Sequence, residues 1–254
     1  MATYKKRGYK PKTKKEKVEV VEENSTTAEV FKSLDEGASK TEEWVVKNQK
    51  YIFGIIGAIA IVVLGFLGYN KFIAEPAQKE AMNEMYQAKK YFEEAVNGVE
   101  SDSLYNMSLN GGEGKYGMLD IISEYSGTPA ANLANYYAGM AYLNLKDYQN
   151  AITFLSDFSS NDKMLSPIAK GGIGDAFVQL EQLEEGLEYY DKAISANTNE
   201  FTTPMYLLKA ARVAIELGSF DKASTYLNRI TTEFSGSTEA TQAEVLIGKV
   251  EASL

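Results

Sequence analysis

The chain has 254 residues, with 26 Lys and Arg against 35 Asp and Glu, and it contains neither cysteine nor histidine. This composition excludes disulfides, thiol nucleophiles and histidine-centred triads, and it disfavours a zinc site because zinc is bound mainly through those two residue types. A carboxylate-only magnesium or calcium site is left open, and no cofactor is predicted. The length predicts one or two domains with a sizeable core.

Charge is distributed unevenly along the chain. Residues 1–50 carry 12 basic and 9 acidic residues, whereas the remainder carries 14 and 26. The first 17 residues hold eight basic side chains and no apolar face, so we predict that 1–50 is a disordered basic tail with room for a short juxtamembrane helix. We interpret the tail as a topology determinant. An arm that binds anionic lipid or ribosomal RNA is the alternative, and no specific nucleic-acid partner is predicted.

Segment 51–69 has no charged residue, and 11 of its 19 residues are Ile, Val, Leu or Phe. As a helix it would be roughly 28 Å long, close to the hydrocarbon thickness of a bilayer. Aromatic residues stand at both edges, where amphipathic rings favour the interface. We therefore predict a transmembrane helix at 51–72. It begins far from the N-terminus and no small-x-small cleavage site follows it, which indicates a retained membrane anchor.

The basic excess before this helix predicts a cytoplasmic N-terminus and a translocated domain, 73–254, which in a bacterium is an inner-membrane protein with a periplasmic domain. Gly54 and Ala58 form a small-xxx-small pair within the helix. The pair permits close approach of another membrane helix, and ordinary glycine tolerance of membrane helices is an equal explanation.

After the anchor, the pattern predicts a helix at 77–97 and a polar, glycine-rich loop at 99–114. Three similar stretches follow at 131–158, 167–194 and 203–230, each read as a helix, a short turn and a second helix. Two half-units flank them. Segment 116–125 is interpreted as the second helix of a degenerate first unit, and 237–252 is interpreted as a closing cap helix.

Each of the three stretches has a small residue in its first helix and another in its second helix, 12 positions later. The pairs are Gly139 with Ala151, Gly174 with Gly186, and Ala211 with Ala223. Two antiparallel helices pack closely where facing side chains are small, so we expect the members of each pair to face each other. This spacing resembles the tetratricopeptide repeat, whose unit is about 34 residues. The expected fold is all-α, with a single transmembrane helix followed by a tetratricopeptide-repeat α-solenoid.

The first helices of such a solenoid build its concave face. The repeat phase predicts that seven residues line this face as a partner-binding surface: Tyr136, Met140, Asp175, Gln179, Leu208, Arg212 and Glu216. The set mixes apolar residues with charges of both signs. Because a carboxylate clamp needs several Lys or Arg, binding of a peptide C-terminus is disfavoured, and unfolded segments or a partner protein fit the adaptable Met and Tyr side chains better. Plain packing between helices is the alternative for each residue.

The order of basic tail, single anchor, glycine-rich loop and repeats, with EYSGTPAANLANYYAGMAYLNLKDYQNAI at the start of the repeats, resembles the YfgM-like family of bacterial membrane-anchored repeat proteins. That resemblance implies a non-catalytic ancillary subunit of the Sec protein translocon, SecYEG. It also implies contact with a PpiD-like periplasmic chaperone, with translocating proteins and with membrane lipid.

Two other function classes stay open at this point. A membrane-anchored scaffold for envelope or outer-membrane assembly could be built on the same repeats. An enzyme is the rival class, but paired carboxylates on helices are usually solvated faces, and the GGEG segment lacks the Lys and Ser or Thr of a phosphate loop. We therefore expect a protein that works by binding.

Overall fold

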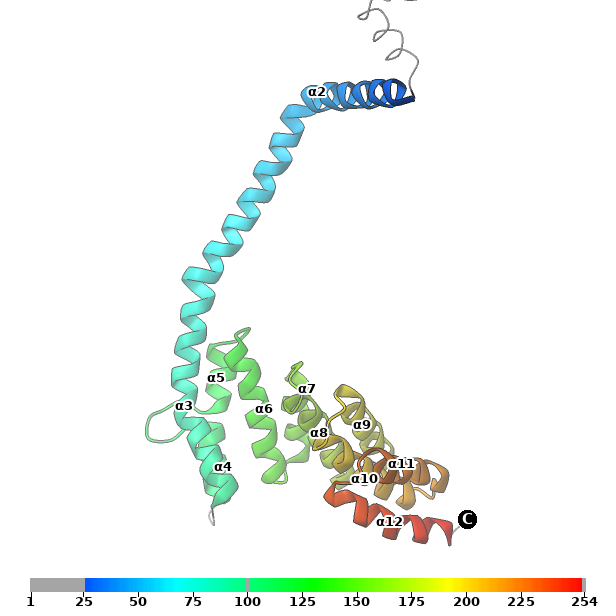
Figure 1. Cartoon of the computed structure of the whole chain (residues 1–254). Helices are drawn as coiled ribbons and strands as arrows, with labels where there is room; N and C mark the ends of the chain where they lie inside the picture. Colours follow the sequence, from blue (N-terminus) through cyan, green and yellow to red (C-terminus); the bar gives the residue numbers. More distant parts are fainter. Residues whose placement is uncertain (1–25, 99–100, 253–254) are drawn as a thin grey trace, which may run out of the picture. The chain divides into compact units, whose positions relative to one another are not determined.

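The computed structural model describes residues 26–98 and 101–252, with side chains from Glu42 onward. The chain forms two compact units, Met1–Tyr69 and Asn70–Leu254. Every regular element of the described residues is helical (Figure 1). The helical solenoid expected from the sequence is therefore confirmed at the level of fold class, and each unit is described by itself below.

The first unit contains one long helix, α2, which spans Thr26–Tyr69. It begins well before the apolar segment, so the helix within 26–50 is longer than the short juxtamembrane helix that the sequence allowed for. Extending an existing helix costs little compared with starting one, and this segment is rich in Ala, Glu and Lys, which are good helix formers. The basic cluster of the first 17 residues lies outside the described residues. The α-helix passes at Tyr69 into the π-helical turn Asn70–Ala74, so the helical backbone continues through the predicted boundary at residue 72.

The apolar part of this helix is fully accessible. Within the described residues, one helical stretch, Glu42–Asn97, is long and apolar enough to cross a membrane, and its most apolar window has a mean hydropathy of 2.5 with none of it buried. Phe53, Val62 and Phe66 are all more than half exposed. A helix with this much exposed apolar surface is consistent with a single-pass membrane anchor, because lipid can cover what water cannot solvate favourably.

The second unit opens with a π-helical turn, η1 (Asn70–Ala74), followed by three helices: α3 (Glu75–Asn97), α4 (Ser101–Asn110) and α5 (Met118–Glu124). The predicted loop at 99–114 is therefore wrong over most of its length. Tyr105, Ser108 and Leu109 are buried and share a core with residues of α3 and α6. Burial of one apolar stripe stabilises a short helix whose remaining residues are polar enough to suggest a loop.

A glycine turn separates α4 from α5. Gly111 has a φ of 83°, in the left-handed region that glycine adopts at no steric cost. The backbones of Gly111 and Gly117 approach so closely that a Cβ on Gly117 would overlap the Gly111 nitrogen. This close approach reverses the chain and sets α5 against α6. The helix expected at 116–125 corresponds to α5, which packs along α6, whereas α4, which was not expected, packs along α3.

Three helix hairpins and a closing helix complete the unit (Figure 1). They are α6 (Pro129–Asn144) with α7 (Tyr148–Asp157), α8 (Leu165–Gln179) with α9 (Leu183–Ala196), α10 (Thr202–Glu216) with α11 (Phe220–Glu233), and α12 (Thr238–Glu251). We refer to α6, α8 and α10 as first helices and to α7, α9 and α11 as second helices. The element α12 matches the cap helix expected at 237–252.

The turn inside each hairpin repeats the same backbone conformation. A leucine caps the C-terminus of the first helix, and the residue after it has a positive φ: 63° at Lys146, 60° at Glu181 and 69° at Gly218. A left-handed residue at this point lets backbone N–H groups bond the last carbonyls of the helix. Asp147 N, for example, donates to Tyr142 O at 2.9 Å. The hairpins therefore share a geometry that their sequences do not share residue by residue.

One of the three small-residue pairs, Gly174 with Gly186, faces across its hairpin as the spacing predicts, whereas the atoms nearest to a Cβ on Gly139 belong to Leu155 and not to Ala151. A Cβ on Gly174 would come within 3.1 Å of the Gly186 carbonyl oxygen, and a Cβ on Gly186 within 3.2 Å of the Gly174 oxygen, so these two glycines face each other. In the preceding hairpin, Gly139 lies against Leu155, with a hypothetical Cβ 2.5 Å from the leucine Cγ. Small residues allow the two helices of a hairpin to pack at short distance.

Candidate partner-binding surface

The predicted partner-binding residues lie on consecutive first helices. These helices also contact one another along the solenoid, α6 with α8, α8 with α10 and α10 with the cap helix α12. We call the surface that they present the first-helix face. The seven predicted residues divide into three groups there: partly buried apolar residues, polar residues that connect neighbouring helices, and one residue that is not accessible.

Tyr136 and Met140 of α6 are partly buried and belong to one apolar cluster. The Tyr136 ring lies 5.3 Å from the ring of Phe158 and 5.6 Å from that of Tyr137, centroid to centroid. Burial raises the pKa of Tyr136 to about 12, so its hydroxyl stays protonated at physiological pH. These two side chains hold α6 in place and leave only part of their surface free for a partner.

Asp175 connects three helices. It accepts a hydrogen bond of 2.7 Å from the Tyr190 hydroxyl of α9, and both of its carboxylate oxygens accept from Lys209 Nζ of α10 at 2.7 Å. Burial, together with the nearby Asp175 charge, raises the pKa of Tyr190. The side chains of Asp175 and Lys209 keep 29% and 36% of their surface exposed. The pair therefore links α8 to α10 while it remains reachable from solvent.

Gln179, Arg212 and Glu216 are the accessible polar residues of the set. Gln179 Oε1 accepts from the Tyr148 hydroxyl at 3.2 Å, and Arg212 Nη2 donates to Gln242 Oε1 of α12 at 2.6 Å. Both contacts are exposed, so water can replace either partner at little cost. These three side chains are the part of the predicted set that is free to meet another protein.

Leu208 does not lie on the accessible face, and that prediction is wrong. Its side chain is 6% exposed and belongs to the apolar core formed by α9 to α12. The helical period places Leu208 on the side of α10 that faces the neighbouring first helices. Periodicity alone does not tell whether a residue on that side lines the accessible surface or lies in the core. The same register places Gly171 of α8 against the ring of Tyr206.

The sequence pattern does not identify Lys209 as part of this surface, although the structure places its ammonium group on Asp175. The contact between Lys209 and Asp175 depends on how far α8 is shifted along α10. That shift is set by how the hairpins pack against each other. The spacing of 34 residues between the two is one repeat length, and that is the signal available in the sequence.

Gly54 and Ala58 lie one helical turn apart on α2, and both are exposed. A Cβ on Gly54 would have nothing within 4 Å. The small-xxx-small arrangement is therefore open to another helix.

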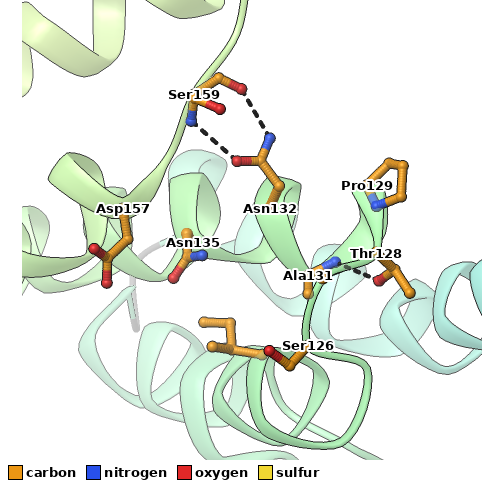
Figure 2. A pocket seen from close by; sticks show the side chains of 10 residues that line it. Ser126, Thr128, Pro129, Ala131, Asn132, Asn135, Asp157 and Ser159 are labelled. Atoms are coloured by element: carbon orange, nitrogen blue, oxygen red, sulfur yellow. Dashed lines mark hydrogen bonds between the residues drawn. The ribbon is translucent and has the colours of Figure 1, made fainter.

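A polar cavity of about 480 Å³ lies beside α6, between the end of α5 and the end of α7. Figure 2 shows its lining, in which Asn132 pairs with the Ser159 backbone and Thr128 caps α6 by accepting from Ala131 N at 3.1 Å. The Asn135 Oδ1 atom is buried in this region and has no hydrogen-bond partner. A second cavity of about 350 Å³ is lined by Glu184, Glu188, Asp191 and Lys222, among others.

Neither cavity has the arrangement of a catalytic centre. Within the part of the chain that the structure describes, no three Asp or Glu side chains are grouped so that they could hold a metal ion. Both linings combine polar side chains with apolar residues, such as Ile122 in the first cavity and Leu187 in the second.

Comparison with known proteins identifies the repeats directly. Residues 133–162, in α6 and α7 and the start of the following loop, and residues 169–200, in α8 and α9, each match a family model described as tetratricopeptide repeat. No curated protein matches the chain. The second unit is thus a helical repeat region of tetratricopeptide type, preceded by a helix long and apolar enough to span a membrane. Repeats of this type bind other proteins and are generally non-catalytic.

Proposed function

We propose that this protein is a membrane-anchored, non-catalytic adaptor that holds a partner protein against the bilayer through its first-helix face. The observation that carries the proposal is the combination of one apolar span with a repeat region whose accessible first-helix residues are polar or partly apolar, without a catalytic arrangement. Tethering raises the effective concentration of the repeats for anything that emerges at the membrane, so moderate affinity suffices.

More specifically, we propose that it is an ancillary subunit of the Sec translocon, with its N-terminus in the cytoplasm and its repeats in the periplasm. Its partners would be SecYEG, a PpiD-like chaperone or the translocating chains themselves. The resemblance of the tail, anchor and repeats to the YfgM-like family supports this assignment, as does the basic excess before the span. The Gly54 and Ala58 pair offers a route for contact inside the membrane.

Orientation is tested by proteolysis. Protease added to intact cells with a permeabilised outer membrane should digest the repeat region and spare residues 1–50. Digestion of the tail with protection of the repeats would reverse the proposed topology and remove the repeats from the periplasm.

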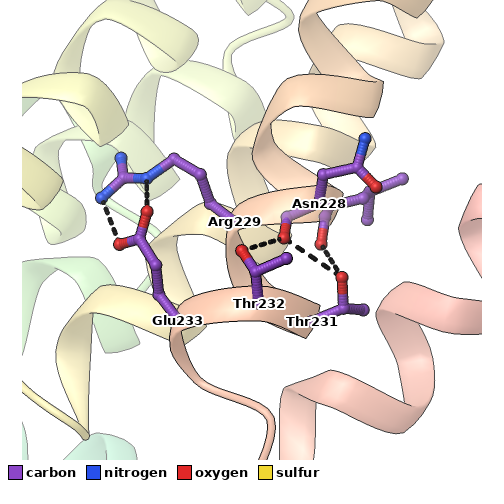
Figure 3. Close-up of polar contacts among 6 residues, drawn as sticks. Asn228, Arg229, Thr231, Thr232 and Glu233 are labelled. Carbon is purple, nitrogen blue, oxygen red and sulfur yellow. Dashed lines mark hydrogen bonds and ion pairs between the residues drawn. The ribbon is translucent and has the colours of Figure 1, made fainter.

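The binding surface is tested with two charge swaps that leave the net charge unchanged. The swap Arg212→Glu/Glu216→Arg alters the first-helix face on α10. The matched control, Arg229→Glu/Glu233→Arg, exchanges a pair of the same spacing on α11, where Arg229 Nε donates to Glu233 Oε1 at 3.0 Å (Figure 3). Both positions on α10 are exposed, and the side chains of Arg229 and Glu233 keep 35% and 47% of their surface exposed, so the fold should survive each swap.

Crosslinking and co-purification of the full-length variants give the readout. We expect the α10 swap to reduce recovery of translocon subunits and chaperone several-fold, and the α11 swap to leave it at the wild-type level. Equal recovery from both would exclude the first-helix face and make the span, with Gly54 and Ala58, the contact to test next. Recovery of envelope assembly proteins in place of translocon subunits would favour the scaffold alternative.

A further inference from the structure

The loops that connect one hairpin to the next form a continuous edge of the second unit. We call this the loop edge, and it consists of four segments: 125–128, 158–164, 197–201 and 234–237. All first helices begin at this edge, and so does α3. The chain reaches this edge soon after the membrane helix, because only the turn η1 separates α2 from the start of α3. Gln78, which lies on it, is eight residues from Asn70, or about 12 Å of helix.

Side-chain hydrogen bonds to the backbone connect the first three of these segments, through the helix starts beside them. Gln78 of α3 accepts from Ala130 N at the start of α6 at 2.9 Å. Asn132 then pairs with both backbone groups of Ser159, at 2.9 Å and 3.0 Å. Asn199 donates from Nδ2 to the Lys163 carbonyl oxygen at 3.2 Å. The edge is thus a connected surface that runs from the membrane-attached end of α3 to the start of α10.

Two of the loops expose an apolar side chain next to the same hydrogen-bond arrangement, in which one side-chain oxygen accepts from two backbone N–H groups. Asp162 Oδ1 accepts from Met164 N and Leu165 N at 2.8 and 2.9 Å, and 37 residues later Asn199 Oδ1 accepts from Phe201 N and Thr202 N at 2.9 and 2.8 Å. The capping oxygen comes from two residues upstream, so the residue at the helix start is free to be apolar. Met164 is 39% exposed and Phe201 is 75% exposed.

The same apolar character continues at the attachment point, where Phe72 and Ile73 are 80% and 56% exposed. Scattered exposed apolar residues are ordinary on soluble proteins, but equivalent positions in successive repeats, on one edge, indicate a shared contact. Asp162, Lys163 and Glu200 are the charged residues of its four segments, so the loop edge carries a net charge of −1. The rest of the region is acidic, and an acidic surface is repelled by anionic lipid.

We propose that the loop edge docks on the bilayer surface, with Met164 and Phe201 inserted among the lipid headgroups. The partner is lipid, because the edge follows the span closely along the chain and carries exposed apolar side chains of a size suited to the interface. The polar cavity beside α6, lined by Thr128, Asn132 and Ser159, lies on the same edge and would face the headgroups. The inference assumes that α2 spans the membrane, as in the proposed function, and adds how the repeats are held.

The absence of cysteine from the chain allows one label at a time to be placed on the full-length protein. An environment-sensitive fluorophore is attached at Met164→Cys, at Phe201→Cys and at Leu180→Cys in vesicles of phosphatidylethanolamine and phosphatidylglycerol. Leu180 is the matched control, because it caps the opposite end of α8 and is 37% exposed. A label at Val62→Cys, in the middle of the span, reports on the anchor itself.

We expect the labels at 164 and 201 to be blue-shifted, quenched by spin-labelled lipids with a shallow nitroxide and shielded from aqueous iodide, with the reverse at 180. Equal water access at all three positions, or equal shielding at all three, would overturn the proposal. Shielding of 164 and 201 in native membranes but not in pure lipid would also overturn it, and would assign the edge to a protein. Failure of deep quenching at 62 would instead contradict the anchor, and with it the proposed function.

Discussion

The hairpins α8–α9 and α10–α11 have the same backbone pattern, but they differ in which helix supplies the large side chains that fill the space between helices. Each element of the second begins and ends 37 residues after its counterpart in the first. The α8 glycines at 171, 172 and 174 correspond to Leu208, Lys209 and Ala211 of α10. At the α8 glycines, the rings of Tyr206 from α10 and Tyr190 from α9 fill the space that a side chain of α8 would occupy. At the equivalent position of α10, Leu208 of that helix fills the space itself. A close-packed solenoid needs the total volume at each interface, and either helix can supply it.

The largest effect is expected from Leu208→Ala, which removes volume where α10 supplies it. The side chain is buried, so its truncation should destabilise the repeats by about 3 kcal/mol through lost burial and a residual cavity. Thermal or urea unfolding of the detergent-solubilised full chain measures this. The control Leu180→Ala, at an exposed position, should cost well under about 1 kcal/mol. Equal losses at the two positions would contradict the burial of Leu208.

Gly171→Leu adds volume where α8 lacks it, and should destabilise by about 2 kcal/mol because the new side chain overlaps the ring of Tyr206. Gly248→Leu is the control, since a Cβ there meets nothing within 4 Å. In a double-mutant cycle, Gly171→Leu with Tyr206→Ala should lose less stability than the sum of the single losses. Additive losses would mean that the glycine and the tyrosine do not share one space.

The turns of the two hairpins allow each residue at the left-handed position to be replaced by the one found in the other turn. Glu181 and Gly218 occupy equivalent left-handed positions, at φ values of 60° and 69°. A non-glycine residue is strained there, so Glu181→Gly should stabilise by about 1 kcal/mol and Gly218→Glu should destabilise by a similar amount. Unfolding midpoints compared at constant pH give both values. A loss of stability in Glu181→Gly would show that its side chain makes a compensating contact.

The smallest effect concerns the caps, which are a carboxylate in one repeat and an amide in the next. Hydrogen bonds from Leu165 N and Met164 N hold the pKa of Asp162 below its ordinary value of 3.8. A lowered folded pKa means that Asp162 stabilises the fold above the ordinary value and loses that contribution as pH falls through the folded value. Asp162→Asn should keep the capping hydrogen bonds, as Asn199 does in the next repeat, and should lose the contribution to stability that depends on pH.

Melting temperatures of wild type and Asp162→Asn between pH 7 and pH 3 test this. The two should stay a constant amount apart down to about pH 4, and below that the wild type should lose stability relative to the variant. A difference that does not change with pH would mean that the carboxylate and the amide cap α8 equally at every pH.

Local sequence patterns were sufficient to predict the helices whose formation depends mainly on neighbouring residues in the sequence. A continuous uncharged run can only be an apolar helix, and small residues 12 positions apart in three successive copies indicate a repeated hairpin before any contact is known. The 101–110 helix was not predicted, although Leu104, Tyr105 and Leu109 recur at helical spacing, because the neighbouring glycines and polar residues outweigh three apolar ones in a short segment.

The chain by itself determined that the protein is helical, that one helix is apolar enough to span a membrane and that the remaining helices come in hairpins of about 35 residues. Tertiary structure alone decided which of the inward-looking residues are reachable. Leu208 and Arg212 are four residues apart on one helix, yet the first is buried in a core shared by four helices and the second is exposed. The reason is that periodicity specifies a face of one helix, whereas accessibility depends on how closely the next helix packs against it.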